Sequence, residues 1–225
     1  MSIFISGNMI DLTVPCPLDM PIWADWFNDS SVTKFLPQGV FPNNECDQEI
    51  FLRNSKESGR ILLMIKSKKG SLLGVTSISN IDYLNSSCQV ASVVPIKAVD
   101  APLAAIEARS LTLTHVFEVL NLKRCWHASV YPGNIKWLIR NFLLGFIPEG
   151  IQYDAFQRNM EINDVIVCSI SRERYSILKA KRNNSFMPRE SFFSDITRIE
   201  NAKNNILNFI KINRQYRELV TNKDC

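Results

Sequence analysis

Few side chains in the sequence have the types and spacing that chemistry requires. There is no Ser-His-Asp order, no H-E-x-x-H and no G-x-x-x-x-G-K-S/T, so a hydrolase, a zinc enzyme or a nucleoside triphosphatase has no support. His127, Asp82 and Glu149 remain as groups that could accept a proton. Each has a structural alternative: a core histidine, a turn carboxylate, or a carboxylate flanking a helix. His115 lies in a helical pattern beside Phe117, and we interpret it as a packing residue.

A longer pattern occupies residues 134–150. The apolar segment 125–131 predicts a strand that a Pro-Gly pair ends, and apolar residues then recur close to helical spacing. Gly145 follows the last apolar turn, where a helix commonly ends in a left-handed residue. Capping of the helix would explain Asn134 alone. It would not explain the complete order of strand, asparagine, helix, Gly-Phe and Glu-Gly.

This order resembles the C-terminal half of the GNAT acyltransferases. The resemblance covers roughly residues 3–178, including the Trp-Phe-Asn-Asp that ends at Asp29. It implies a GNAT-like sandwich, acetyl-CoA as the acyl-donor cosubstrate and a primary amine as the acceptor. It also implies that Asn134 contacts the acyl-CoA arm and that His127 or Asp82 acts as the general base.

The cofactor prediction rests on the junction between a strand expected at 88–94 and a helix expected at 100–120. In the family the CoA pyrophosphate lies there, because a helix N-terminus with small residues lets the backbone approach a phosphate. This segment has no glycine, although several alanines keep it small and Lys97 adds a cation. Pro102 lacks an amide donor and Asp100 adds a carboxylate, so an ordinary helix cap is the alternative. The predicted CoA-binding residues are Val93, Val94, Ile96, Lys97, Ala98, Ala101, Leu103, Ala104, Asn134 and Trp137.

Other positions depart from the family pattern. Members often carry a tyrosine seven residues after the helix-opening asparagine as the general acid, whereas Asn141 stands here and cannot donate a proton. Trp137 occupies a position that is commonly serine or alanine in one branch. The strand that often supplies a glutamate base offers Gln89 and Ser92. A GNAT fold that has lost catalysis is therefore the rival interpretation.

The elements that must position these residues follow from hydrophobic periodicity. Alternating or continuous apolar runs predict a strand or hairpin at 3–14 and strands at 61–66, 71–80, 88–94, 125–130, 147–155 and 164–170. Helical spacing predicts helices at 19–36, 44–58, 100–120 and 134–144, the second capped by Asn43 or Asn44. We therefore expect an α+β fold with a mostly antiparallel sheet of about seven strands, about four helices and a C-terminal helical extension.

Size and composition predict an ordinary globular protein. Of 225 residues, 46% are hydrophobic and 21% are charged, which is enough for a sizeable core. No apolar run approaches the roughly 20 residues of a membrane span, and the N-terminus lacks the pattern of a signal peptide. The six cysteines are scattered singly, which predicts reduced thiols in the cytoplasm rather than a metal site or disulfides.

The net charge of +4 is unevenly distributed along the chain. Residues 1–178 carry 16 Lys and Arg against 17 Asp and Glu, whereas residues 179–225 carry 10 against 5. We expect a GNAT-like acyltransferase domain at 1–178, which has no electrostatic signature for nucleic acid, and a basic extension at 179–225. Apolar residues of an amphipathic helix recur in the extension at Ile206, Phe209, Ile210, Tyr216, Leu219 and Val220. The helix is expected to dock on the domain, to form a homodimer contact or, last, to touch a membrane surface or a polyanion.

The sequence thus predicts a cytoplasmic N-acetyltransferase in which the amine attacks the thioester directly. The segment 74–84 resembles acetyltransferases of nucleotide-linked amino sugars, and the 3–178 frame resembles the branch that acetylates ribosomal-protein N-termini. We favour a small amine such as an amino sugar, because the body has no charge field that would steer a protein substrate. The alternatives are a protein N-terminal acetyltransferase and a catalytically inactive binding protein.

Overall fold

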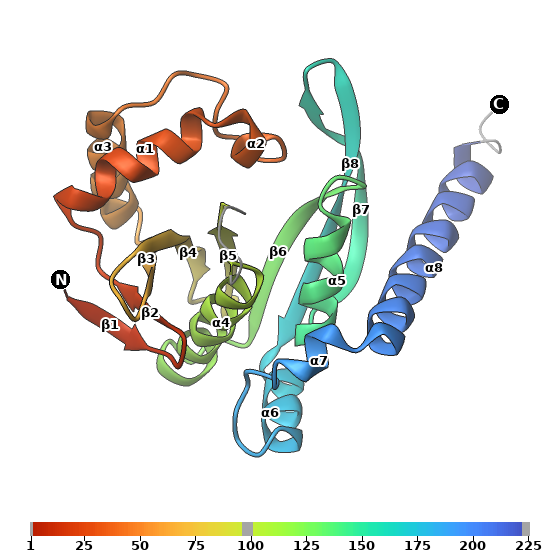
Figure 1. Cartoon of the computed structure of the whole chain (residues 1–225). Helices are drawn as coiled ribbons and strands as arrows, with labels where there is room; N and C mark the ends of the chain where they lie inside the picture. Colours follow the sequence, from red (N-terminus) through yellow and green to blue (C-terminus); the bar gives the residue numbers. More distant parts are fainter. Residues whose placement is uncertain (1, 96–100, 222–225) are drawn as a thin grey trace. The chain divides into compact units, whose positions relative to one another are not determined.

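Residues 2–95 and 101–221 are described by a computed structural model, in which the chain divides into two compact units (Figure 1). The first unit contains Met1–Cys125 and Ser171–Met187, and the second contains Trp126–Ile170 and Pro188–Cys225. The chain therefore leaves the first unit after Cys125 and returns to it for one further helix, α6 (Arg172–Lys181). Each unit combines β-strands with helices.

Five antiparallel strands form the sheet of the first unit. In sequence order they are β1 (Ile3–Ser6), β2 (Ile10–Thr13), β3 (Ile61–Ser67), β4 (Leu72–Asp82) and β5 (Ser87–Val93). The segment predicted as a strand or hairpin at 3–14 is the β1–β2 hairpin, which accounts for one strand beyond the seven predicted. The central strand β3 is buried along most of its length, and this explains its continuous apolar run.

Helices cover both faces of this five-stranded sheet. Leu63 packs on the face covered by α4 (Ala101–Thr114), whereas its neighbours Leu62 and Met64 pack on the face covered by α1 (Met20–Asn28). Successive side chains of a strand point to opposite faces, so the single strand β3 anchors a helix on each side. The first unit therefore has a three-layer core.

The helix predicted at 44–58 is present as α3 (Glu45–Glu57), which pairs with α1. Asn44 is its cap: the side chain of Asn44 accepts the Asp47 N–H at 3.1 Å, and the Asp47 carboxylate accepts the Asn44 N–H at 2.9 Å. These reciprocal bonds satisfy two N–H groups at the helix start. The helix predicted at 19–36 is interrupted after α1 and continues as the single turn α2 (Ser30–Thr33).

The second unit contains a three-stranded sheet, a helix on that sheet and the C-terminal extension. Its strands are β6 (Arg124–Tyr131, in this unit from Trp126), β8 (Glu161–Ser171) and β7 (Ile147–Arg158), in that spatial order, and its helices are α5 (Ile135–Leu144), α7 (Ser191–Ser194) and α8 (Ile196–Thr221). The strands β7 and β8 form one long antiparallel hairpin. Helix α8 lies along α5 and β7 (Figure 1).

Docking of the C-terminal helix is confirmed for its first half only. Ala202, Ile206 and Ile210 are buried, so this part of α8 is packed on the rest of the second unit. Tyr216 and Val220, which we expected to be covered as well, are exposed. The apolar periodicity of the sequence extends further along the helix than the packing does.

The predicted α+β class is confirmed, with differences in number. The described residues form eight α-helices and eight strands, against about four and about seven predicted. The additional helices are the single turns α2 and α7, the closing helix α6, and α8, which the prediction treated as a separate extension. No helix within residues 2–95 and 101–221 is both long and apolar enough to cross a membrane.

Candidate functional site

The predicted site residues fall into two groups, one in each unit. The first unit holds Asp82, Val93, Val94, Ala101, Leu103 and Ala104, and the second holds His127, Asn134 and Trp137. Ile96, Lys97, Ala98 and the predicted cap Asp100 lie outside the described residues.

Strand β5 ends at Val93, a predicted CoA-binding residue, and Val94 follows it directly. Val93 pairs with Val75 of β4, and the Val93 carbonyl lies very close to Gly74. A Cβ atom at Gly74 would stand 2.5 Å from the Val93 oxygen and 2.9 Å from a methyl group of Val94. Only glycine permits this approach of two backbones, so Gly74 sets the position of Val93 and Val94. Sequence reasoning did not assign a role to Gly74.

Helix α4 begins at Ala101, the first helical residue of the predicted CoA site. Ala104 is buried in the core with Ala108 and the strand residue Leu63, whereas Leu103 is half-buried. The small side chain of Ala104 is therefore explained by close packing of the helix on the sheet. Leu103 remains the more accessible of the two predicted contacts.

Glu107 on α4 is a buried carboxylate that sequence reasoning missed. It is 3% exposed, and its oxygens accept the backbone N–H groups of Asn8 at 2.6 Å, Met9 at 2.9 Å and Ile10 at 3.1 Å. Two of these donors lie in the turn of the β1–β2 hairpin, and the third is the first residue of β2. Glu107 therefore ties α4 to that hairpin, and the only sequence signal was an acidic residue within an apolar helix.

Arg109, also on α4, is fully buried near two cysteines. Burial lowers the pKa of Arg109 to about 10, so the guanidinium stays charged at neutral pH. Burial and a hydrogen bond with Cys88 raise the pKa of the Cys125 thiol well above its usual value. Because a thiolate is the reactive form of cysteine, Cys125 is not a nucleophile at neutral pH.

Asp82 lies at the end of β4, in the turn that leads to β5. Its two carboxylate oxygens accept the Asn85 backbone N–H at 2.9 Å and the Asn85 side-chain amide at 2.7 Å. The backbone bond first and the side-chain bond second lower the pKa of Asp82. A carboxylate that is stabilised in its charged form is a weaker base, so these contacts favour the structural role.

His127 lies on β6 and is 2% exposed. Its ring packs edge-on against Phe146, with the ring centres 4.7 Å apart, and its Nδ1 atom lies 3.4 Å from the hydroxyl of Ser129. His127 is therefore a core residue, as the structural alternative predicted, and an aromatic ring and a hydroxyl hold its imidazole in one orientation. A proton acceptor requires such a fixed position.

Asn134 occupies the N-cap position of α5, where its carbonyl accepts the Leu138 N–H at 2.9 Å. Its side chain makes no capping hydrogen bond, and its backbone N–H donates to the Val130 carbonyl at 2.8 Å. Helix capping, the alternative explanation, therefore holds for the position of Asn134 but not for its side chain. Its half-buried side-chain amide is left for another partner. Trp137, one turn further along α5, is also half-buried.

Asn141, at the position where the family often has a tyrosine, is buried on α5. Its Nδ2 donates to the Trp137 carbonyl at 2.9 Å, and its buried Oδ1 has no partner among the described residues. Its backbone carbonyl accepts the N–H groups of Gly145, which ends the helix with φ +134°, and of Phe146, which contacts the imidazole described above. Buried polar atoms are rarely unpaired. Asn141 therefore presents an oxygen that an N–H group of a ligand, or a water, would satisfy.

Glu149, the third candidate proton acceptor, lies on β7 and accepts a hydrogen bond from the Ser169 hydroxyl of β8. The neighbouring Cys168 is buried, and burial first and the Glu149 carboxylate second raise the pKa of its thiol to about 12. The glutamate is thus engaged across the hairpin, and the adjacent cysteine is unreactive at neutral pH.

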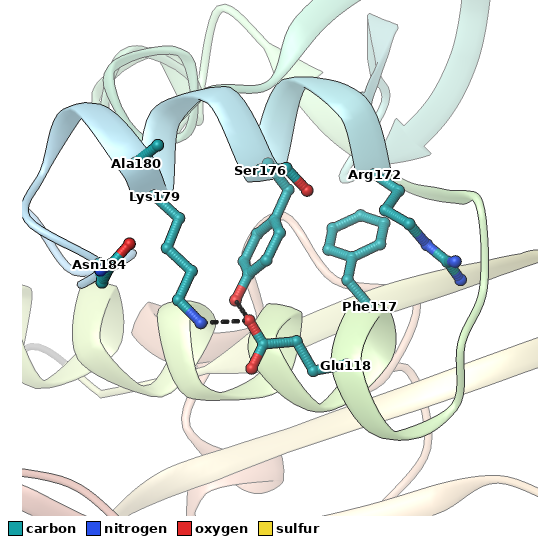
Figure 2. A pocket seen from close by; sticks show the side chains of 8 residues that line it. Phe117, Glu118, Arg172, Ser176, Lys179, Ala180 and Asn184 are labelled. Carbon is teal, nitrogen blue, oxygen red and sulfur yellow. Dashed lines mark hydrogen bonds and ion pairs between the residues drawn. The ribbon is translucent and has the colours of Figure 1, made fainter.

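A cavity of about 230 Å³ lies in the first unit between α6 and the π-helical turn η2 (His115–Val119) that follows α4 (Figure 2). Glu118 and Lys179 face each other there and form an ion pair, and the hydroxyl of Tyr175 donates to Glu118 at 2.7 Å. None of the predicted site residues that the structure describes lines this cavity. Its polar groups attach α6 to the rest of the unit.

Comparison with known proteins identifies the fold. No family model and no curated protein matches the sequence. Among solved structures, the spermidine N-acetyltransferase of Vibrio cholerae in complex with CoA and spermine is 16% identical, with a TM-score of 0.69 over 76% of this chain and 99% of that chain. An acetyltransferase of the GNAT family from Bacillus anthracis is 20% identical, with a TM-score of 0.64 over 75% of this chain and 98% of that chain.

RimJ of Mycobacterium smegmatis, in complex with CoA-disulfide, is 15% identical, with a TM-score of 0.66 over 77% of this chain and 90% of that chain. The predicted GNAT-like fold is therefore confirmed. The matches include nearly all of each of these chains but only 75–77% of the present chain. About a quarter of the present chain therefore lies outside the shared fold.

Proposed function

We propose that the protein is an acetyl-CoA-dependent N-acetyltransferase that acts on a small primary amine. The observation that carries this proposal is the fold shared with almost the full length of a spermidine N-acetyltransferase that holds CoA and an amine. The sequence pattern of residues 134–150 and the geometry of Asn134 support it independently, because that asparagine leaves its side chain uncommitted to the helix.

The groups proposed to bind the acyl-CoA are those that the sequence pattern predicts, together with Asn141. The end of β5 at Val93 and Val94 supplies backbone groups in the position that Gly74 sets. On α5, Asn134 supplies an amide and Asn141 supplies a buried acceptor oxygen. Acetyl-CoA supplies the activated acetyl group, and the carbon–sulfur bond breaks to release CoA as its thiolate without a strong acid, because we take the pKa of the CoA thiol to be about 8.5 as for free cysteine. This agrees with the absence of a proton donor at Asn141.

Deprotonation of the acceptor amine is then the step for which the protein must provide a base. His127 is our candidate, because the turn contacts of Asp82 lower the pKa of that carboxyl and make it a weaker base. We expect the rate to rise with pH through one ionisation, without a descending limb. Replacement His127→Ala should remove this rise and slow turnover by about 10²-fold, the low end for a general base. An unchanged rate and pH profile would show that the histidine is structural.

The acceptor is proposed as a small amine, with a nucleotide-linked amino sugar as the specific candidate and a protein N-terminus as the alternative. A panel that contains a polyamine, an amino-sugar nucleotide and a short peptide with a free N-terminus separates these classes. Acetylation of the peptide alone would contradict the small-amine proposal.

A second candidate, a binding protein of this fold without activity, is favoured by Asn141 and by the glycine-free segment after β5. Thermal unfolding with acetyl-CoA is the deciding experiment. At 100 times its Kd, a bound ligand adds about 2.7 kcal/mol to the free energy of unfolding. An unmoved melting curve at millimolar acetyl-CoA would refute the enzyme proposal, whereas stabilisation without acetylation of any amine would favour the binding protein.

A further inference from the structure

The C-terminal half of α8 and the β7–β8 hairpin enclose a cavity of about 500 Å³ within the second unit. This volume is in the range of small-molecule sites, roughly 300–1,000 Å³. Within residues 2–95 and 101–221, none of the predicted acetyl-transfer residues lines it. The residues that give it chemical character are Tyr131, Tyr153, Asp154, Asp164, Arg214 and Arg217.

One side of the cavity holds a tight ion pair. Arg214 Nη2 lies 2.8 Å from Asp164 Oδ2, and the hydrogen bond to Asp164 raises the pKa of Arg214. The guanidinium also lies 5.9 Å from the centre of the Tyr131 ring. Because the Asp164 side chain is only 12% exposed, this pair is partly shielded from solvent.

The other side of the cavity repeats these three residue types with a looser ion pair. Arg217 lies over the Tyr153 ring, 4.2 Å from its centre, but its Nη2 is 3.4 Å from Asp154 Oδ2, and the two side chains are 47% and 64% exposed. Exposed ion pairs contribute about 0–1 kcal/mol. Arg217 is therefore a weakly held cation on an aromatic and acidic surface.

The hairpin presents Asp154 toward this surface by an irregularity in its backbone. The register of β7 and β8 shifts between Gln152 and Phe156, and Asp154 has a left-handed φ of +56°. The second oxygen of Asp164 accepts the Asp154 N–H at 3.1 Å and holds this conformation. Bulges of this kind redirect side chains at functional sites.

Two polar groups of the cavity lack a partner within the described residues. The hydroxyl of Tyr153 is buried and makes no hydrogen bond there, and the carboxylate of Glu218 makes no ion pair there. With Asp154 and Asp164, Glu218 brings the lining to three carboxylates against two guanidinium groups. Among the described residues, the lining thus has one carboxylate more than it has guanidinium groups, together with two aromatic rings.

We propose that this cavity binds an organic cation of the alkyl diamine or polyamine class, and that Arg217 is the resident cation with which the ligand competes. A carboxylate neutralises an ammonium group, and a tyrosine ring attracts it electrostatically. The alkyl chain of such a ligand would lie against the aromatic rings. The site goes beyond the proposed acetyl transfer, because it involves none of those residues.

The test is direct calorimetric titration of the full chain with 1,4-diaminobutane, without acetyl-CoA, so its outcome does not depend on acetyltransferase activity. The wild type should bind the diamine, and Arg217→Ala should bind it about fivefold more tightly, the ratio that corresponds to a cation–π contact of about 1 kcal/mol. Glu218→Gln, an exposed change that leaves the fold intact, should weaken binding by a similar factor.

Arg198→Ala is the matched control, because Arg198 lies on the same helix, 4.4 Å from the centre of the Phe192 ring, and pairs with Asp195 at 2.9 Å away from the cavity. It should leave the affinity unchanged. The proposal is overturned if neither the wild type nor Arg217→Ala binds the diamine at millimolar concentration, or if a dicarboxylate such as glutarate binds instead. It is also overturned if the diamine binds but Arg217→Ala and Glu218→Gln have no more effect than the control, since binding would then occur elsewhere.

Discussion

Helices α4 and α8 are both packed on a sheet, but the polar contacts that hold them differ in kind. Glu107 of α4 is almost fully buried and accepts three backbone N–H groups of one hairpin. The last turns of α8 are held by Arg214 and Arg217, whose side chains are about half exposed. Hydrogen bonds to a charged group contribute about 1.5–3 kcal/mol each, and exposed ion pairs contribute about 0–1 kcal/mol.

This difference separates a helix that must stay in place from one whose end can move. The first turn of α4 belongs to the predicted CoA site, so displacement of the helix would also displace Leu103. The end of α8 covers a cavity with groups that lack partners, and a ligand could displace its weaker contact. The distribution of buried and exposed charge therefore matches the proposed roles of the two helices.

The largest expected effect comes from removal of the buried carboxylate. Glu107→Ala leaves three backbone donors without their acceptor and should lower the free energy of unfolding by about 4 kcal/mol. Urea unfolding measures this loss. Glu107→Gln is the control, since it keeps one acceptor oxygen and should cost clearly less. Equal losses in the two variants would show that charge, and not the three hydrogen bonds, fixes α4.

The docking of α8 is tested by two isoleucines of the same helix. Ile206 is 0% exposed, so Ile206→Ala should cost about 3 kcal/mol, whereas Ile212 is 57% exposed and Ile212→Ala should change stability by less than about 0.5 kcal/mol. Thermal unfolding of both variants measures the difference. A loss of similar size for the two substitutions would mean that α8 does not dock through its Ile206 face.

The sequence predicts most of the fold because its periodicity is regular where the core is. The helix expected at 134–144 is α5, and the apolar run at 61–66 is the buried strand β3. Periodicity does not show how far a helix is covered. Tyr216 and Val220 continue the apolar stripe of α8, but nothing in the described residues covers them.

The polar part of the site was less predictable, because its contacts join residues far apart in the chain. The partners of Glu107 are about 100 positions away, and a charged residue in a helix is ordinarily assigned to solvent. Spacing identified Asn134 but could not show that its amide is not a cap. From the sequence, Asn141 could be identified only as a position where the acidic tyrosine of the family is replaced. The burial of its side-chain oxygen depends on packing, which the sequence does not show.

A smaller effect is expected from the close approach of β4 and β5. Gly74→Ala places a methyl group against the Val93 carbonyl, so the strands must separate at a cost of about 2 kcal/mol. Because this shift moves Val93 and Val94, acetyl-CoA affinity should fall as well. Calorimetry measures both quantities. Gly59→Ala, with open space around the added methyl group but a positive φ of +71°, controls for backbone strain alone and should leave acetyl-CoA affinity unchanged.

The smallest effect concerns the attachment of α6, which is intermediate between those of α4 and α8. The hydrogen bond from Lys179 first, and that from Tyr175 second, lower the pKa of Glu118 below its ordinary value of 4.5. A carboxyl with a lowered pKa in the folded state stabilises the protein above its unfolded pKa, and this contribution is lost as the pH falls through the folded pKa. The wild type should therefore lose it below about pH 4.5, within the usual acid range of carboxyl titration.

Glu118→Gln has no such carboxyl, so its melting temperature should fall less than that of the wild type between pH 7 and pH 3. Glu200→Gln is the matched control, because Glu200 pairs with Lys203 at 3.5 Å on the exposed surface of α8. Its melting temperature should follow that of the wild type across this range. If Glu118→Gln also follows the wild type, the ion pair in Figure 2 contributes no more than an ordinary surface pair, and α6 is held by its other contacts, which include the bond from Arg172 to the Leu122 carbonyl at 2.8 Å.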